Sequence, residues 1–133
     1  MYKVSSWIFL LTGIAVGLGA FGHDSNAAKV AAEVAKFPTF DPRIAKVLFA
    51  VWHFCSGCML VFGATIVWTW WRWRRGERRH FLPAELIAVL YLVVGPASVA
   101  YTGIPFFWLF FALGLLLLAS SLPMRRAHER SPA

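Results

Sequence analysis

Residues 44–70 read IAKVLFAVWHFCSGCMLVFGATIVWTW, and this stretch decides the class of fold. It is long enough to cross about 30 Å of hydrocarbon as an α-helix, because each helical residue adds about 1.5 Å. Three further apolar stretches cover residues 5–22, 83–103 and 105–122. Hydrophobic residues make up 59% of the 133 residues and charged residues only 14%, against about 25% in soluble domains. The sequence therefore predicts one membrane domain over residues 1–133.

The four stretches predict an all-α fold, an antiparallel integral membrane four-helix bundle. Only residues 102–105 separate the third stretch from the fourth, which predicts a tight helical hairpin. Intrinsic disorder and a disulfide-stapled secreted module do not fit this composition.

Residues 25–37, SNAAKVAAEVAKF, separate apolar from charged side chains at helical spacing. They predict a short interfacial helix between spans one and two, lying on the membrane surface or across the bundle mouth. Asp24 or Ser25 is expected to cap its start. Asp41 before Pro42 is typical of a helix start and predicts where the second span begins.

Basic residues gather on one side of the predicted bundle. With four spans, nine Lys or Arg lie at the termini and between spans two and three, and four lie between spans one and two. The positive-inside rule then places both termini in the cytoplasm. The nine are Lys3, Arg72, Arg74, Arg75, Arg78, Arg79, Arg125, Arg126 and Arg130, and the four are Lys29, Lys36, Arg43 and Lys46. Tryptophans beside the arginines favour membrane anchoring and lipid headgroup contact, and nucleic acid is not expected as a partner.

Small residues recur inside the predicted spans. In lipid they allow two helix backbones to approach closely, so we expect them at helix–helix contacts, although they can also leave room for a flat cofactor or a lipid tail. A Gly-Pro pair in the third span predicts a kink that either opens a pocket or fits a neighbouring helix. These residues are Gly13, Gly17, Gly57, Gly63, Ala64, Gly95 and Pro96.

His53 is the one ionisable side chain, cysteines apart, that lies well inside a predicted span. Such a group is a functional hypothesis by default. Several polar residues at the outer ends of the other spans share its depth, and Trp108 belongs to an aromatic collar at the start of span four. The predicted ligand-binding residues are His53, His23, Asp24, Ser98, Tyr101 and Trp108, and we expect His53 to face the bundle interior.

Three interpretations of this outer cluster stay open. It can be a polar plug whose side chains bond one another and the backbone. It can contact a ligand or substrate. His23 and His53 can also hold a metal ion or haem, with a carboxylate orienting them. No residue is predicted to be catalytic. The collar of phenylalanines around Trp108 is either a lipid-facing belt or a wall for a quinone, a pigment or a sterol-like lipid.

Cys55 and Cys58 form a CxxC pair. At about 100° per residue they lie about 160° and 140° around the helix from His53, so one straight helix cannot aim all three at one metal ion. We interpret them as small hydrophobic residues. A redox pair and a soft-metal site are the alternatives.

Gly22-His23 at the end of span one and Trp52-His53 in span two, with the four-span layout, give the chain a similarity to small bacterial membrane proteins of the broad DoxX-like kind. This resemblance implies the bacterial inner membrane. It also implies partnership with quinone-linked oxidoreductases.

The first functional hypothesis is a non-enzymatic integral membrane protein that binds a hydrophobic molecule or serves as accessory subunit of a membrane complex. The second is a haem- or metal-binding redox protein that uses His23 and His53. The third is a small transporter working as an oligomer. The expected partners are the lipid bilayer and either other membrane subunits or further copies of the chain.

Overall fold

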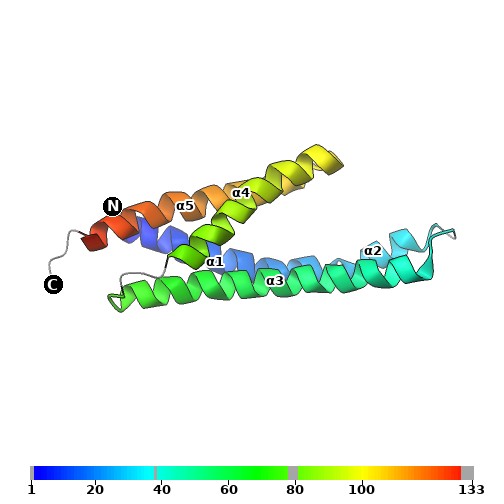
Figure 1. Cartoon of the computed structure of the whole chain (residues 1–133). Coiled ribbons are helices and arrows are strands. Elements are labelled where there is room, and N and C mark those ends of the chain that lie inside the picture. The colour runs from blue at the N-terminus through cyan, green and yellow to red at the C-terminus, as the bar shows by residue number, and fades with distance from the viewer. Residues whose placement is uncertain (1, 38, 78–80, 130–133) are drawn as a thin grey trace.

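The structure is a computed structural model that describes residues 2–37, 39–77 and 81–129. Every regular element in these ranges is helical, which confirms the predicted all-α fold. The elements are α1 (Tyr2–Ser25), α2 (Ala27–Val34), α3 (Pro42–Arg74), α4 (Leu82–Thr102), the 3₁₀ turn η1 (Pro105–Phe107) and α5 (Trp108–Glu129) (Figure 1). Arg78, Arg79 and Arg130, which contribute to the predicted charge asymmetry, lie outside the described residues.

Four helical segments are long and apolar enough to cross a membrane: residues 2–34, α3, α4 and residues 105–127. The chain is therefore a membrane-type four-helix bundle, as predicted. Helix α3 has 33 residues, or about 50 Å at 1.5 Å per residue, which exceeds the hydrocarbon thickness. It begins at Pro42, with Asp41 as N-cap accepting a hydrogen bond of 2.7 Å from the backbone N–H of Arg43, so the predicted helix start is confirmed.

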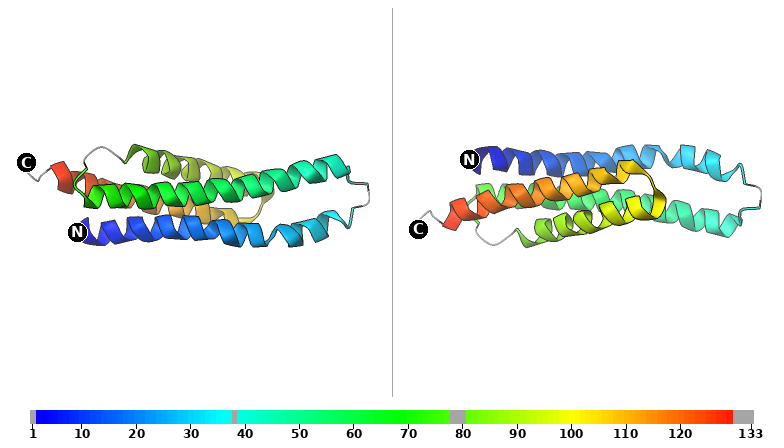
Figure 2. Two further views of the ribbon diagram at one scale, coloured as in Figure 1. Left: turned by 90° about the horizontal axis from the view of Figure 1, so that it is seen from below. Right: turned by 90° about the horizontal axis from the view of Figure 1, so that it is seen from above.

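The bundle consists of two helical hairpins. Helix α1 packs along α3, α4 packs along α5, and α1 also packs against α5. Helix α4 approaches α3 only lightly, and across the described residues α1 and α4 are diagonal, with no close approach of their backbones. Figure 1 shows α4 diverging from α3 toward the α4–α5 turn, and Figure 2 shows the α1–α3 hairpin extending beyond that turn. Both termini lie at the opposite end, which is called the terminal end below.

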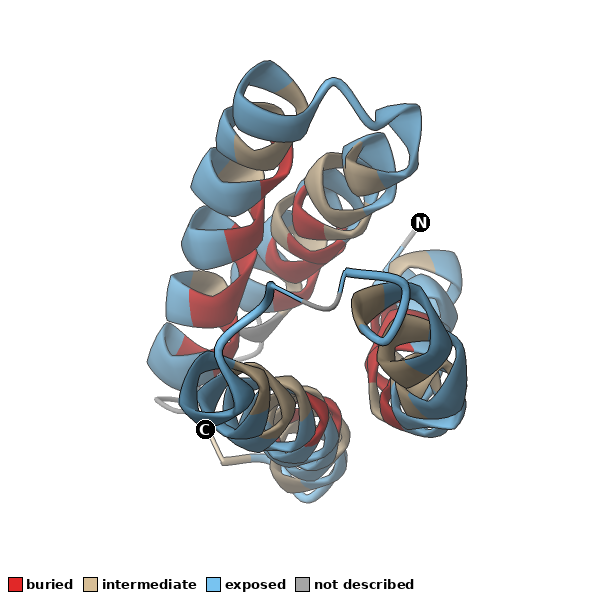
Figure 3. Ribbon diagram, turned by 90° about the vertical axis from the view of Figure 1, so that its right-hand side faces the viewer, coloured by how far each residue is buried: buried red, intermediate tan, exposed pale blue. Residues whose placement is uncertain are grey.

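The hydrophobic core lies in the half of the bundle nearest the terminal end. Phe9, Ile66, Ala88, Leu117 and Met124 are almost completely buried there, and they come from all four long helices. Figure 3 shows the buried segments facing the bundle axis and the exposed ones facing outward. Because the side chains that would face lipid are apolar, the exposed outer surface fits a bilayer rather than water.

Glycines set the closest approach between α1 and α3. A Cβ atom on Gly63 would lie 2.5 Å from Gly17 Cα and 2.8 Å from the Gly13 carbonyl oxygen. The predicted role of these three glycines in helix packing is therefore confirmed. Gly57 and Ala64 do not share it, because a Cβ atom on Gly57 meets nothing within 4 Å and Ala64 is exposed.

Glycines also set the closest approach between α4 and α5. A Cβ atom on Gly95 would lie 2.7 Å from the backbone nitrogen of Phe111, and one on Gly114 would lie 2.7 Å from the carbonyl oxygen of Ala88. Gly95, just before Pro96, therefore fits its neighbouring helix. The predicted tight hairpin is confirmed, since Gly103 ends α4 in the left-handed conformation with φ 69°.

The short helix between the first two spans is present as α2, but with a different start. Its N-cap is Asn26, which makes no side-chain cap, so the predicted cap by Asp24 or Ser25 is wrong. The Ser25 hydroxyl instead donates back to the Gly22 carbonyl at 2.9 Å. Helix α2 touches only α1 and α3 and continues beyond α1 (Figure 2), so it does not cover the α4–α5 turn. Its position at a membrane interface stays a prediction.

Candidate functional site

The candidate site lies where the last turns of α1 pass the first third of α3, away from the terminal end. The imidazole of His23 stacks on the indole of Trp52, with ring centroids 4.1 Å apart and an interplanar angle of 19°. The indole Nε1 of Trp52 donates to the His23 carbonyl oxygen at 3.0 Å. These two contacts fix the His23 ring against α3.

A buried hydroxyl on α3 fixes the orientation of the same ring. Nδ1 of His23 lies 2.9 Å from Oγ of Ser56, and that hydroxyl donates to the Trp52 carbonyl oxygen at 3.3 Å. When the hydroxyl gives its one proton to the Trp52 carbonyl, Nδ1 of His23 is the donor and Nε2 is left as an acceptor. In this tautomer the neutral His23 ring has a lone pair on Nε2 that can accept a hydrogen bond.

His53 and Asp24 form the second half of the cluster. Nδ1 of His53 lies 2.6 Å from Oδ1 of Asp24, and the two side chains are 57% and 50% exposed. The carboxylate holds the proton on Nδ1, so Nε2 accepts when the ring is neutral and donates when it is protonated. Exposure screens the pair, so it contributes little to stability, and its main effect is to orient the ring.

His53 lies on the outward face of α3. At about 100° per residue it is about 180° around the helix from Phe62. The Phe62 ring packs on Tyr91 of α4, with centroids 6.2 Å apart. His53 therefore points away from α4, and the expectation that it faces the bundle interior is wrong.

The structure brings together three of the six predicted site residues, His23, Asp24 and His53. Ser98 and Tyr101 lie near the end of α4, whose backbone does not closely approach α1 within the described chain, and Tyr101 is 92% exposed. Trp108 starts α5 and packs its ring on Phe111 at 5.6 Å. These three residues lie on the other hairpin.

The sequence analysis did not predict two residues of this cluster. They are Trp52, which stacks on His23, and Ser56, which bonds it. The available signal was Ser56 three residues after His53, a small polar residue in a helix that is otherwise apolar at that depth. Its hydroxyl satisfies both a backbone carbonyl and an imidazole, which explains why it is buried at 8% exposure.

A metal centre has no donor set in the described part of the chain. No group of three or more His, Cys, Asp or Glu side chains there lies close enough to hold a metal ion. Both cysteines are free thiols, with Cys55 exposed and Cys58 half-buried.

No protein-family description matches this sequence, and comparison with curated proteins and with solved structures finds no similar chain. The resemblance to DoxX-like proteins stays a prediction.

Proposed function

We propose that this four-helix membrane protein binds a hydrophobic molecule with a polar head group along the outward face of α3. The observation that carries the proposal is the polar cluster of His23, Asp24, His53 and Ser56. Within the described residues each imidazole uses Nδ1 for a protein partner, while no protein group bonds Nε2. Two oriented imidazole nitrogens at the end of an apolar bundle are suited to hydrogen-bond a ligand head group.

The apolar part of the ligand would lie below His53. Gly57, Leu60 and Ala64 fall within about 40° of His53 around α3. Leu60 and Ala64 are exposed, and open space surrounds Gly57, where a Cβ atom would meet nothing within 4 Å. A molecule bound there would have its head at His53 and its apolar body against the helix, at the depth of lipid tails.

The same face favours a second candidate function, that of an accessory subunit. Small residues and a polar side chain on one exposed face are the features that let transmembrane helices associate. The partner would then be a transmembrane helix of another subunit, packed over Gly57 and Ala64 with a hydrogen bond to His53. The membrane would be the bacterial inner membrane, with both termini in the cytoplasm.

The test is mass spectrometry of the organic extract of protein purified in a neutral detergent. We expect one hydrophobic molecule per chain in the wild type and at least about a tenfold loss in His53→Leu, because a hydrogen bond to an imidazole disappears. Lys36→Gln is the control, since Lys36 is exposed just after the end of α2 and its ion pair among the described residues is with Glu33. This variant should retain the molecule.

Two outcomes would contradict ligand binding: an extract without a stoichiometric molecule, and equal retention by His53→Leu. The proteins present in the same purified samples distinguish the accessory-subunit function from ligand binding. A subunit interface predicts a second membrane protein at fixed ratio. Gly57→Leu should remove it, because the larger side chain prevents the close approach of a partner helix.

A further inference from the structure

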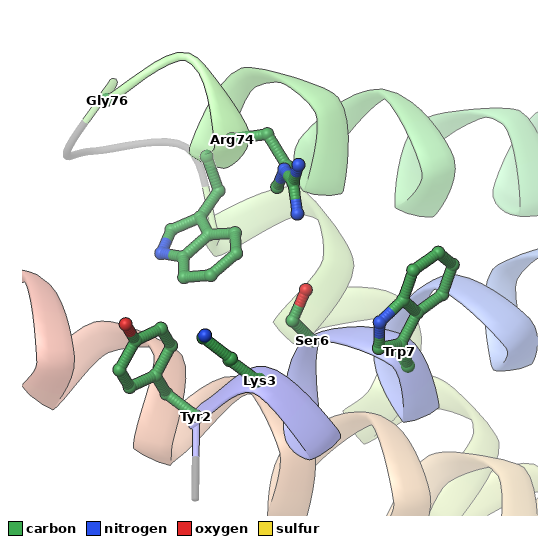
Figure 4. Close-up of a pocket in the computed structure, with 7 residues that line it drawn as sticks. Tyr2, Lys3, Ser6, Trp7, Arg74 and Gly76 are labelled. Atoms are coloured by element: carbon green, nitrogen blue, oxygen red, sulfur yellow. The ribbon is translucent and has the colours of Figure 1, made fainter.

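A cavity at the terminal end of the bundle is separate from the polar cluster. It has a volume of about 540 Å³ and lies between the start of α1 and the end of α3. Its lining is cationic and aromatic, with Tyr2, Lys3, Ser6, Trp7, Trp73, Arg74 and Gly76. Figure 4 shows Arg74 of α3 extending toward Ser6, and Lys3 of α1 extending into the same space on the side of Tyr2.

The walls of this cavity are held in place by specific contacts. The Trp70 indole donates to the Ser6 hydroxyl at 2.8 Å, and the Trp73 indole donates to the Met124 carbonyl at 3.3 Å. The Tyr2 ring packs edge-on against Trp73 with centroids 6.5 Å apart. These contacts between α1, α3 and α5 fix the shape of the cavity.

Its positive charge is not neutralised by protein. Within the described residues no carboxylate pairs with Lys3 or Arg74, whereas Arg72 pairs with Glu77 and Arg125 with Glu85. The Arg74 guanidinium lies 5.5 Å from the Trp70 ring centroid, a contact that leaves its N–H groups free for an anion. The positive end of the α1 dipole lies at the same place.

We infer that this cavity binds the phosphate group of an anionic phospholipid. Lys3 and Arg74 would hold the phosphate from two sides, and the buried Ser6 hydroxyl would donate to it. Tryptophans mark the depth at which lipid headgroups meet a membrane protein. Trp7 and Trp73 line this cavity, and Trp70 bonds its Ser6 hydroxyl.

The surface below the cavity favours a lipid over a soluble phosphate. Leu11, Ile14 and Leu18 follow Trp7 at helical spacing along α1, and all of them are exposed. This apolar track leads from the cavity toward the middle of the membrane. It provides a surface on which an acyl chain can lie while its headgroup occupies the cavity.

The test is native mass spectrometry of the full chain titrated with phosphatidylglycerol in a neutral detergent. We expect one tightly retained lipid in the wild type and at least about tenfold weaker binding in Lys3→Gln/Arg74→Gln, because both charge-assisted hydrogen bonds to the phosphate are lost. The matched control is Arg75→Gln/Arg126→Gln, which removes the same charge from exposed residues outside the cavity lining. The control should bind within about twofold of the wild type.

Equal binding by the two double variants would overturn the inference, because the lipid would then respond only to net charge. A parallel titration with glycerol 3-phosphate separates the two sources of phosphate. We expect it not to displace the lipid, and displacement at similar concentration would overturn the assignment to a lipid. Circular dichroism of each variant confirms that the helices are retained before binding is compared.

Discussion

Replacing Gly63 by alanine is expected to destabilise the bundle by about 1–3 kcal/mol, the usual range for overpacking a close contact. The added methyl group would lie 2.5 Å from Gly17 Cα and 2.8 Å from the Gly13 carbonyl oxygen. Both are backbone atoms of α1, so no side chain can rotate to make room. The two helices must separate, and the contacts along their crossing weaken together. Unfolding by sodium dodecyl sulfate in mixed micelles, followed by circular dichroism, measures the loss.

Gly57→Ala is the matched control for this prediction. It makes the same chemical change on the same helix, but a Cβ atom there meets nothing within 4 Å. Alanine also favours a helix over glycine, so we expect unchanged or slightly higher stability. If Gly63→Ala unfolds at the same detergent fraction as Gly57→Ala, the close α1–α3 crossing is incorrect.

Replacing Gly95 by alanine is expected to weaken the other hairpin to a similar extent. The new methyl group would lie 2.7 Å from the Phe111 backbone nitrogen and 3.1 Å from the Phe107 carbonyl oxygen. Helix α4 would have to move away from η1 and α5, which disturbs the packing of the Tyr91 ring on Phe110 at 5.4 Å. The same unfolding assay should show a loss of about 1–3 kcal/mol.

Gly22→Ala, on α1, is the control for the Gly95 prediction. It makes the same chemical change, but a Cβ atom at Gly22 meets nothing within 4 Å. We expect this variant to unfold like the wild type. A Gly95→Ala variant as stable as Gly22→Ala would show that α4 and α5 do not approach each other at this glycine.

Most of the fold could be predicted because hydropathy and length determine it. Four apolar stretches and one very short connection leave few arrangements besides an antiparallel bundle. The contact of Asp24 with His53 could also be anticipated, since consecutive antiparallel spans bring residues of equal depth together. The sequence does not show which side of α3 packs against the other helices.

Residues of equal depth meet only if their helices are neighbours. The sequence predicts Ser98 and Tyr101 at the depth of His23, but α1 and α4 are diagonal across the described bundle and the two hairpins diverge. This arrangement depends on the sum of many packing contacts, above all at Gly63 and Gly95. Residue depth along one sequence does not show which helices are neighbours. The prediction therefore grouped Ser98 and Tyr101 of α4 with His23 of α1, from which the structure separates them.

The central claim is that the chain crosses a membrane four times, with the polar cluster opposite the termini. Single cysteines at Lys29 and Arg126, in a Cys55→Ser/Cys58→Ser background, test this claim through labelling by a membrane-impermeant maleimide on intact spheroplasts. Both positions are exposed in the structure. The account predicts that Lys29→Cys is labelled directly and Arg126→Cys only after the membrane is opened. Labelling of both residues from the same side would contradict it.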